Sequence, residues 1–199
     1  MVSLGALREE ALGCVACPLA GSRTRVVFGS GDPRARLMFV GEAPGRDEDL
    51  VGEPFVGRSG ALLDRLMAEE LGVDRASVYI ANVVKCRPPG NRDPRPGEVA
   101  SCSHFLQGQV EAVSPEVVVT LGNFATRSLL SRDEGITRLR GTSYRFAQGW
   151  LVPTFHPAAA LRGGGDTVAK MRADLVRAGQ LLGGAGGPTN EAALPVARP

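Results

Sequence analysis

Apolar residues occur in short runs along the chain, and each run is followed by a turn or by a segment with helical spacing. Four runs have the length and composition of buried strands, within residues 36–45 (RLMFVGEAPG), 77–86 (SVYIANVVKC), 115–122 (PEVVVTLG) and 143–157 (SYRFAQGWLVPTFHP). The last run reads as a hairpin around Ala147, Gln148 and Gly149 that leads into its strand. These runs therefore predict four buried strands.

Segments with helical spacing of apolar residues alternate with these strands. We predict helices over residues 3–13, 58–71, 96–113, 123–130 and 166–182. Pro96 stands near the first turn of its helix, and Asn123 at or near the cap of the next one. The alternation predicts an α/β fold with a mostly parallel, four-stranded sheet that is covered on both faces. A ligand would then bind at the carboxyl ends of the strands.

Length and composition suit one packed domain. The chain has 199 residues, of which 43% are hydrophobic, and we expect a single domain over residues 1–182. Residues 183–199 are rich in Gly, Pro and Ala, and we expect them to be disordered. The N-terminal segment carries three charges where a signal peptide would be apolar, and no long apolar run follows. We expect a monomeric cytoplasmic protein with no membrane partner.

The net charge leaves nucleic acid open as a partner. It is only +2, yet Lys85 and Lys170 are the two lysines, so nearly all positive charge is arginine. Arginine suits phosphate oxygens and stacks on bases. An arginine-biased genome explains the same count.

The four cysteines are the first candidate for a specific chemistry. Cys14 and Cys17 form a C-x2-C pair, whereas Cys86 and Cys102 stand at the ends of the proline- and arginine-rich segment KCRPPGNRDPRPGEVASC. Disulfides are rare in a reducing compartment. Four thiolates can ligate zinc or an iron-sulfur cluster, and the C-x15-C spacing suits the bulkier cluster better. Four unrelated buried cysteines are the alternative.

Several polar residues stand at or near strand ends. Glu42 lies in the glycine-bounded turn GEAPG, where a plain tight turn would not require a carboxylate at a buried strand end. Asn82 interrupts an apolar run and is either a satisfied core residue or a reader of a ligand edge. His156 and Phe55, taken singly, are typical of structural positions. Parallel strands would bring Glu42, Asn82 and His156 to one cleft.

These motifs together resemble the family 4 uracil-DNA glycosylases, which carry a [4Fe-4S] cluster. The resemblance rests on GEAPG, GEPFVGRSGALLD, YIANVVKCRPP with NRDP, VVVTLG and FHPAAALR, plus the four cysteines, and it runs from about Cys14 to about Leu182. It implies a three-layer α/β/α sandwich that removes uracil from DNA in base excision repair and leaves an abasic site. It also implies that Cys14, Cys17, Cys86 and Cys102 hold the cluster in a structural role.

The resemblance also implies roles in the site. Phe55 matches the phenylalanine that stacks on the flipped base, Asn82 the asparagine that pairs with the polar edge of uracil, and His156 the histidine that bonds uracil O2. Glu42 matches the carboxylate that positions water or offsets positive charge on the sugar. Glu48 resembles the residue whose side chain would collide with the thymine methyl group. Uracil would also contact Gly41 and Ala43.

The chemistry of uracil release agrees with these roles. A base must leave the stack before its glycosidic bond can be reached, and an aromatic platform offsets part of that cost. A donor at O2 stabilises negative charge that develops there as the bond breaks. An asparagine held in one orientation matches uracil N3–H and O4, whereas cytosine reverses both groups.

DNA contacts are expected from the cleft rim. The predicted DNA-binding residues are Arg58, Ser59, Arg87, Arg92, Leu161 and Arg162, and Arg95 is a further candidate. Leu161 would fill the gap left by the extruded base, and Arg162 would reach a phosphate. The wedge segment AAALR departs from the bulkier residues common there. Residues 87–101 contain no histidine, so no covalent trapping of DNA is predicted.

A non-enzymatic module of another class remains as an alternative. Four thiolates could hold one zinc ion in a domain that binds nucleic acid without releasing a base. A visible absorption spectrum separates the two hypotheses, since an iron-sulfur protein is brown and a zinc protein is colourless.

Overall fold

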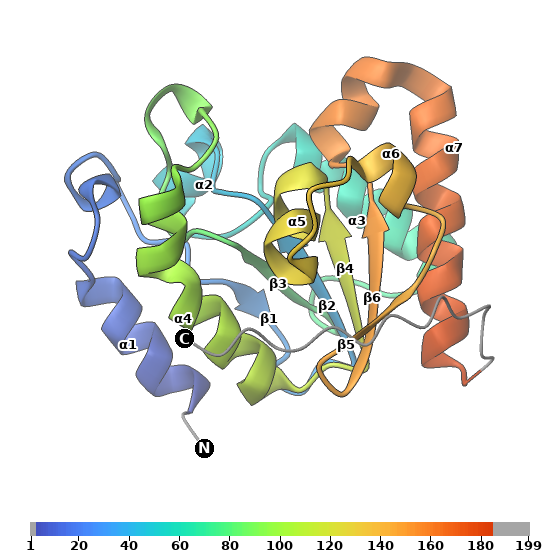
Figure 1. Ribbon diagram of the computed structural model, residues 1–199, viewed down its shortest axis with the longest axis horizontal. Coiled ribbons are helices and arrows are strands. Elements are labelled where there is room, and N and C mark those ends of the chain that lie inside the picture. Colours follow the sequence, from blue (N-terminus) through green and yellow to red (C-terminus); the bar gives the residue numbers. More distant parts are fainter. Residues whose placement is uncertain (1–2, 185–199) are drawn as a thin grey trace.

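The computed structural model describes residues 3–184, so nearly all of the predicted tail lies outside the described residues (Figure 1). The α-helices are α1 (Leu4–Gly13), α2 (Arg46–Val51), α3 (Arg58–Leu71), α4 (Pro96–Val113), α5 (Asn123–Leu130), α6 (Ile136–Leu139) and α7 (Pro157–Leu182). The strands are β1 (Ser30–Gly31), β2 (Leu37–Gly41), β3 (Tyr79–Asn82), β4 (Val117–Leu121), β5 (Tyr144–Phe146) and β6 (Gly149–Thr154). Two short 3-10 helices cover Pro18–Gly21 and Pro89–Asn91.

The sheet is mostly parallel, as predicted, but it has six strands rather than four. Their order is β1-β3-β2-β4-β6-β5. The four central strands run parallel, and the edge strands β1 and β5 are each antiparallel to their neighbour. The prediction omitted β1 because its two residues carry no apolar signal, and it treated β5 only as one arm of a hairpin.

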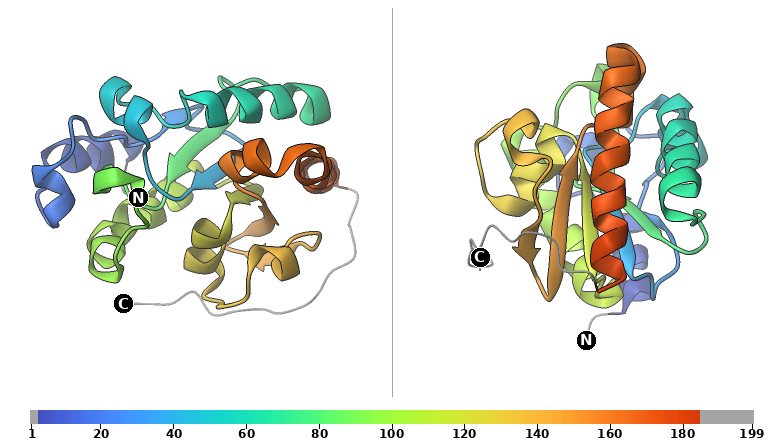
Figure 2. Two further views of the ribbon diagram at one scale, coloured as in Figure 1. Left: turned by 90° about the horizontal axis from the view of Figure 1, so that it is seen from above. Right: turned by 90° about the vertical axis from the view of Figure 1, so that its right-hand side faces the viewer.

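Alternating side chains of the central strands build two apolar layers. Met38 and Val40 of β2 pack with α1, α4 and α5 on one face of the sheet. Leu37 and Phe39 of the same strand pack with α3 and α7 on the other face. Because successive residues of a strand point to opposite faces, a continuous apolar run is what a strand buried on both sides requires. The views in Figure 2 show the resulting three layers.

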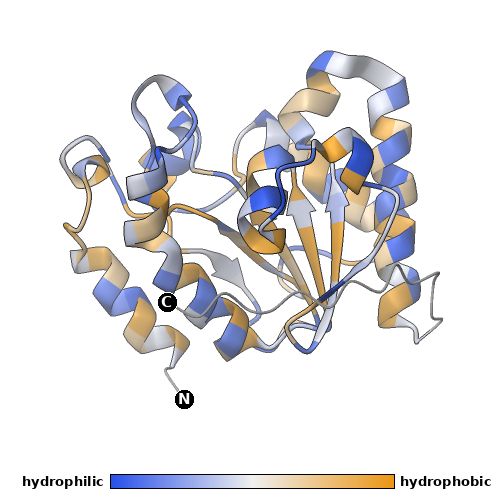
Figure 3. Ribbon diagram, in the orientation of Figure 1, coloured by the Kyte–Doolittle hydropathy of each residue, from blue (hydrophilic) through white to orange (hydrophobic). Residues whose placement is uncertain are grey.

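Hydropathy follows this arrangement. The central strands are coloured as mainly hydrophobic, whereas the helices carry polar stripes on their outer sides (Figure 3). No helix within residues 3–184 combines the length and the apolar character needed to cross a membrane.

Two departures from the predicted elements bear on the site. Helix α7 begins at Pro157 rather than near residue 166, and Gly164 interrupts it with φ of 69°. Strand β3 ends at Asn82, so the buried residues 83–86 continue as irregular chain toward Cys86. As a result, the N-terminus of α7 and the C-terminal end of β3 both lie at the carboxyl edge of the sheet.

Candidate active site

A cleft of about 1240 Å³ opens at the carboxyl ends of the parallel strands. Its walls include Glu42 after β2, Asn82 at the end of β3, and His156 after β6. Phe55 joins them from the loop between α2 and α3. Glu42, Asn82 and His156 therefore share one cleft, as predicted, because neighbouring parallel strands end at the same edge of the sheet.

Asn82 presents an unsatisfied acceptor to this cleft. The residue is 2% exposed, and its side-chain Oδ1 has no hydrogen-bond partner. Its main-chain carbonyl accepts from Nζ of Lys85 at 2.7 Å. A buried amide oxygen without a partner is costly in a folded protein, so Asn82 is not a satisfied core residue.

Gly41 explains how the amide and the aromatic ring lie so close together. A Cβ atom at Gly41 would stand 2.4 Å from Oδ1 of Asn82 and 2.6 Å from Cζ of Phe55. Any side chain at this position would displace one of the two. Gly41 is not among the residues that line the cleft, so its predicted contact with uracil stays a prediction, but it leaves room for both side chains.

His156 is fixed as a neutral donor. It caps the N-terminus of α7, where its Nδ1 accepts from the main-chain N–H of Ala158 at 3.1 Å. Burial, reinforced by the charge of Arg162, lowers the pKa of His156 to about 4. The neutral imidazole with Nδ1 as acceptor carries its proton on Nε2. That N–H is the group available to a ligand.

Phe55 lies beside the histidine. Its ring centroid is 5.7 Å from that of His156, with 32° between the ring planes. The side chain is 6% exposed, and its backbone has φ of 54°, in the left-handed region. A bulky residue rarely adopts this conformation, so the surrounding loop must hold it there.

Glu42 is a carboxyl group with an unusual affinity for its proton. Partial burial, together with charge repulsion and a hydrogen bond from the nearby carboxyl group of Asp93, raises its pKa to about 7. Both residues line the cleft. A group with a pKa near neutrality at a ligand cavity is typical of functional positions.

Glu48 is engaged within the protein. One carboxylate oxygen accepts from the main-chain N–H groups of Val56 and Gly57 at 2.9 and 3.0 Å, and the other from Gly45 at 3.1 Å. Its side chain still lines the cleft, as does Ala43. The predicted contact of Glu48 with a methyl group stays a prediction, while its contacts show that it ties the GEAPG turn to the Phe55 loop.

The predicted DNA-binding residues are distributed unevenly. Five of the six line the cleft, namely Arg58, Ser59, Arg92, Leu161 and Arg162. Leu161 is 50% exposed at the rim. Arg87 is outside the lining, and its Nε donates to Asn91. Arg92 forms two hydrogen bonds with the buried carboxylate of Glu98, at 2.6 and 2.9 Å, so its guanidinium already has a partner.

Three further residues of the cleft were missed by sequence reasoning. Asp93 carries no local signal, because its neighbour Glu42 is about fifty residues away in the sequence. Asn123 stands next to the helix cap, Gly122, in agreement with its prediction at or near the cap, but its place in the cleft was not predicted; its amide oxygen accepts from Ile136 at 2.6 Å. Arg127 lines the same wall. Its position one turn along α5 could have suggested this.

The cysteines gather at a second, smaller cavity. Cys14, Cys17, Cys86 and Cys102 all line it, with Arg23 beside them. Nη1 of Arg23 donates to the sulfur of Cys86 at 3.4 Å, and the main-chain N–H of Lys85 donates to that of Cys102 at 3.3 Å. Cys102 lies inside α4 rather than in a loop. Within residues 3–184, no three Cys, His, Asp or Glu side chains are grouped as ligands of a single metal ion.

Comparisons with known proteins agree on one group. Residues 28–178 match the model of the uracil DNA glycosylase superfamily. The chain is 46% identical to a type-4 uracil-DNA glycosylase of Sulfurisphaera tokodaii, over 81% of this chain and 77% of the relative. It is 48% identical to a type-4 uracil-DNA glycosylase of Thermotoga maritima, over 77% of this chain and 81% of the relative.

Proposed function

The chain belongs to the type-4 uracil-DNA glycosylases of the uracil DNA glycosylase superfamily, and we propose that it removes uracil from DNA by hydrolysing the N-glycosidic bond. The product would be an abasic site, which makes the protein an enzyme of base excision repair. Membership of this enzyme family argues against the alternative of a non-enzymatic zinc module.

The unpartnered Oδ1 of Asn82 is the observation that carries the proposal. Asn82 lines the same cleft as the Phe55 ring, and its Oδ1 lacks the donor that a buried acceptor needs. Uracil N3–H is such a donor, and the same amide would donate to uracil O4. Cytosine offers an acceptor and a donor in the reverse order, which leaves buried polar atoms unpaired and penalises that base.

Bond cleavage would use the proton on Nε2 of His156. When the C1′–N1 bond breaks, its electron pair passes to the base and negative charge collects on O2. A neutral imidazole N–H aimed at O2 stabilises that charge without first burying a positive charge of its own. Water then adds to C1′ and its proton passes to solvent.

Glu42 would act on the sugar side. The sugar gains positive charge as the base departs, and an ionised carboxylate stabilises it or orients the attacking water. The raised pKa of about 7 makes this carboxylate only partly ionised at neutral pH. The rate should therefore depend on pH near that value.

The donor set of the second cavity fits an iron-sulfur cluster. All four thiols line one cavity, and N–H donors reach two of the sulfurs. Cys14, Cys17, Cys86 and Cys102 would hold the cluster. When bound, the cluster would supply a rigid cross-link and no chemical step in uracil release. It would join the N-terminal segment, the chain after β3, and α4.

DNA would approach the rim of the cleft. Leu161 is exposed at the start of α7 and would enter the space left by the extruded nucleotide. Arg162 and Arg58 would contact phosphates on either side. Single-stranded DNA avoids the cost of unpairing, so both single- and double-stranded substrates suit this geometry. The single domain, the monomeric state and the cytoplasmic location stay predictions.

The test is release of the base from a defined substrate. An oligonucleotide with one uracil is incubated with the protein in the presence of a chelator of divalent metals and is then treated with alkali. We expect strand cleavage at the uracil position alone, and none at cytosine or thymine in matched oligonucleotides. Intact uracil strands after incubation with folded protein would contradict the proposal.

A further inference from the structure

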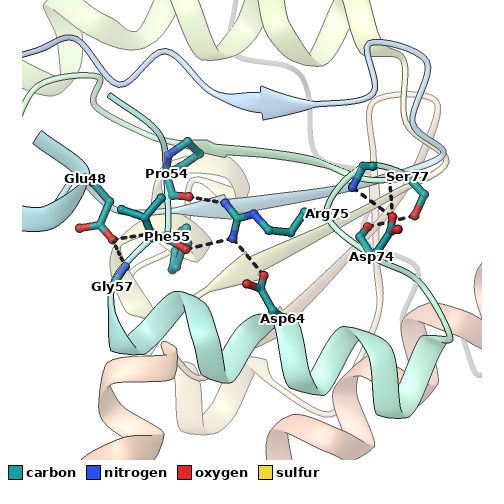
Figure 4. A network of polar contacts seen from close by, with 10 residues as sticks. Glu48, Pro54, Phe55, Gly57, Asp64, Asp74, Arg75 and Ser77 are labelled. Carbon is teal, nitrogen blue, oxygen red and sulfur yellow. Dashed lines mark hydrogen bonds and ion pairs between the residues drawn. The ribbon is translucent and has the colours of Figure 1, made fainter. Parts of the chain in front are cut away.

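The Phe55 loop, residues 52–57, is hydrogen-bonded by an arginine that does not line the cleft. Arg75 lies in the segment between α3 and β3, and it is not among the residues that line the cleft. Its guanidinium donates to the main-chain carbonyls of Pro54 at 2.5 Å and Phe55 at 2.9 Å. Figure 4 shows the side chain reaching across to both carbonyls. One side chain thus holds two consecutive peptide groups.

Asp64 fixes the guanidinium in this position. Its carboxylate accepts from Nη1 of Arg75 at 3.0 Å, and it projects from α3 (Figure 4). The arginine side chain is 29% exposed and the aspartate side chain 41%. An ion pair this exposed adds little stability by itself. Its geometric effect is larger, because a planar fork that is held by a carboxylate presents its other donors in fixed directions.

The backbone conformation at Phe55 requires stabilising interactions of this kind. Phe55 is a non-glycine residue in the left-handed region, a strained conformation that persists only where the surroundings impose it. Gly60 makes room for it, since a Cβ atom there would stand 1.7 Å from the Phe55 carbonyl oxygen. Glu48 holds the N–H groups of the next two residues. Arg75 therefore binds two carbonyl groups of the loop, and Glu48 binds two of its N–H groups.

The conformation of this loop decides where the ring lies. With the left-handed backbone, the ring lines the cleft beside His156 and next to Gly41. Relaxation to an ordinary backbone conformation would move the ring from this position. Arg75 lies outside the cleft, but it can still fix the position of the ring, because the carbonyls that it binds belong to Phe55 and to the residue before it.

We propose that Arg75 is a positioning residue for uracil excision, which acts through the Pro54 and Phe55 carbonyls to hold the Phe55 ring under the flipped base, with Asp64 orienting its guanidinium. This inference rests on the proposed function. It assigns to Arg75 no contact with DNA or with uracil. Its effect should therefore appear in the chemical step and depend on the presence of the phenyl ring.

The test is a double-mutant cycle between Arg75→Met and Phe55→Ala. Single-turnover uracil release is measured with enzyme in excess, and affinity is measured on DNA without uracil. Arg75→Met should slow release by roughly 10- to 100-fold, the scale of a small misplacement of a positioning group. Affinity for undamaged DNA should stay within about twofold. In the Phe55→Ala background, Arg75→Met should change the rate by less than about twofold, because the group it positions is gone.

Arg36→Met is the matched control. Arg36 also forms an ion pair, with Glu116, and also donates to a main-chain carbonyl, that of Leu182, but it lies away from the cleft. It should leave the rate unchanged in both backgrounds. Should Arg75→Met fail to fold, the same cycle with Asp64→Ala decides the question, since that variant frees the guanidinium but keeps its donors.

Two results would overturn the inference. One is an unchanged rate in Arg75→Met. The other is an equal loss with and without the phenyl ring, which would indicate a general effect on folding or on DNA. Neither result touches the proposed function, because that fails only if the wild-type protein releases no uracil.

Discussion

The cleft and the cysteine cavity lie at the two ends of one short segment, residues 82–86. The side chains in the two sites are held in place by different interactions. In the cleft, the protein itself fixes the groups, since Lys85 holds the Asn82 carbonyl and the Ala158 N–H holds His156. In the cavity, one N–H donor each for Cys86 and Cys102 is the extent of the hydrogen bonding described for the four sulfurs within residues 3–184.

The consequence of burial for the pKa values also differs between the two sites. Burial lowers the pKa of His156 to about 4 and so fixes the neutral donor that the cleft requires. Burial raises the pKa of the Cys86 thiol to about 11, which opposes the thiolate that a cluster requires. The polypeptide itself preorganises the cleft, whereas the proposed cluster would be needed to fix the cavity. Changes in the two regions should therefore fail differently.

The largest effect is expected from Cys86→Ser. Loss of one ligand should remove the visible absorbance and lower stability by about 4 kcal/mol or more, since loss of a metal centre is among the few changes of that size. At this chain length the Tm should fall by roughly 8–16 °C, and activity should fall with it. Absorbance and thermal melting report both. Ser103→Ala on the same helix is the control, and a stable, active Cys86→Ser protein would refute the scaffold role.

Asn82→Ala should show the opposite pattern. Uracil release should fall by about 1000-fold, the upper range for removing a preorganised polar group at a reacting substrate. Visible absorbance and Tm should be unchanged, because the amide oxygen has no partner to lose. Gln107→Ala, at an exposed position on α4 outside the cleft lining, should keep its activity. Loss of colour in Asn82→Ala would show that the two regions are not separable.

The pH dependence should sharpen the role of Glu42. If its ionised form is the active one, uracil release should rise as pH increases through about 7. His156 contributes no transition there, because its pKa is about 4 and it stays neutral. Asp93→Asn removes a charge that raises the Glu42 pKa, so the rise should move to lower pH.

A pH series of single-turnover rates checks this prediction. The ratio of the Asp93→Asn rate to the wild-type rate should be close to one near about pH 8 and should increase as the pH falls below about 7. Asp166→Asn, whose carboxylate pairs with Lys170 on the exposed side of α7, should give the wild-type profile. If the profiles of Asp93→Asn and wild type superimpose, Glu42 is not the group whose ionisation controls the rate.

The smallest effect is expected from Arg162→Met. This rim residue would neutralise one phosphate, so DNA affinity should weaken similarly for all sequences and the slope of log affinity against log salt should decrease by about one. Fluorescence anisotropy at several salt concentrations measures the slope. Arg138→Met, an exposed arginine outside the cleft lining, should leave it unchanged. An unaltered slope in Arg162→Met would place the DNA elsewhere on the rim.

The sequence predicted most of this fold because its signals are local. Apolar runs and helical spacing located the four central strands and the body of each main helix. The start of α7 was missed because three consecutive glycines, residues 163–165, hide its helical pattern. The two-residue β1 has too little side-chain pattern to predict.

The candidate site was predictable where side chains carry the signal. Asn82, His156 and Glu42 stand out as polar residues at apolar strand ends, and the cysteine spacing is explicit. Sequence alone left Asn82 open between core residue and ligand reader, and its unpartnered oxygen decides between them. Arg75 and Asp93 could not be found, because one acts through main-chain carbonyls and the other through a neighbour remote in sequence.

A crystal structure of the protein with an oligonucleotide that carries a cleavage-resistant 2′-fluoro uracil nucleotide would show whether the cleft binds an extruded uracil. We expect the uracil to lie in the cleft, stacked on Phe55, with N3 at hydrogen-bond distance from Oδ1 of Asn82 and O2 at hydrogen-bond distance from Nε2 of His156. A uracil that stays stacked in the DNA, or that binds away from these three side chains, would contradict this expectation.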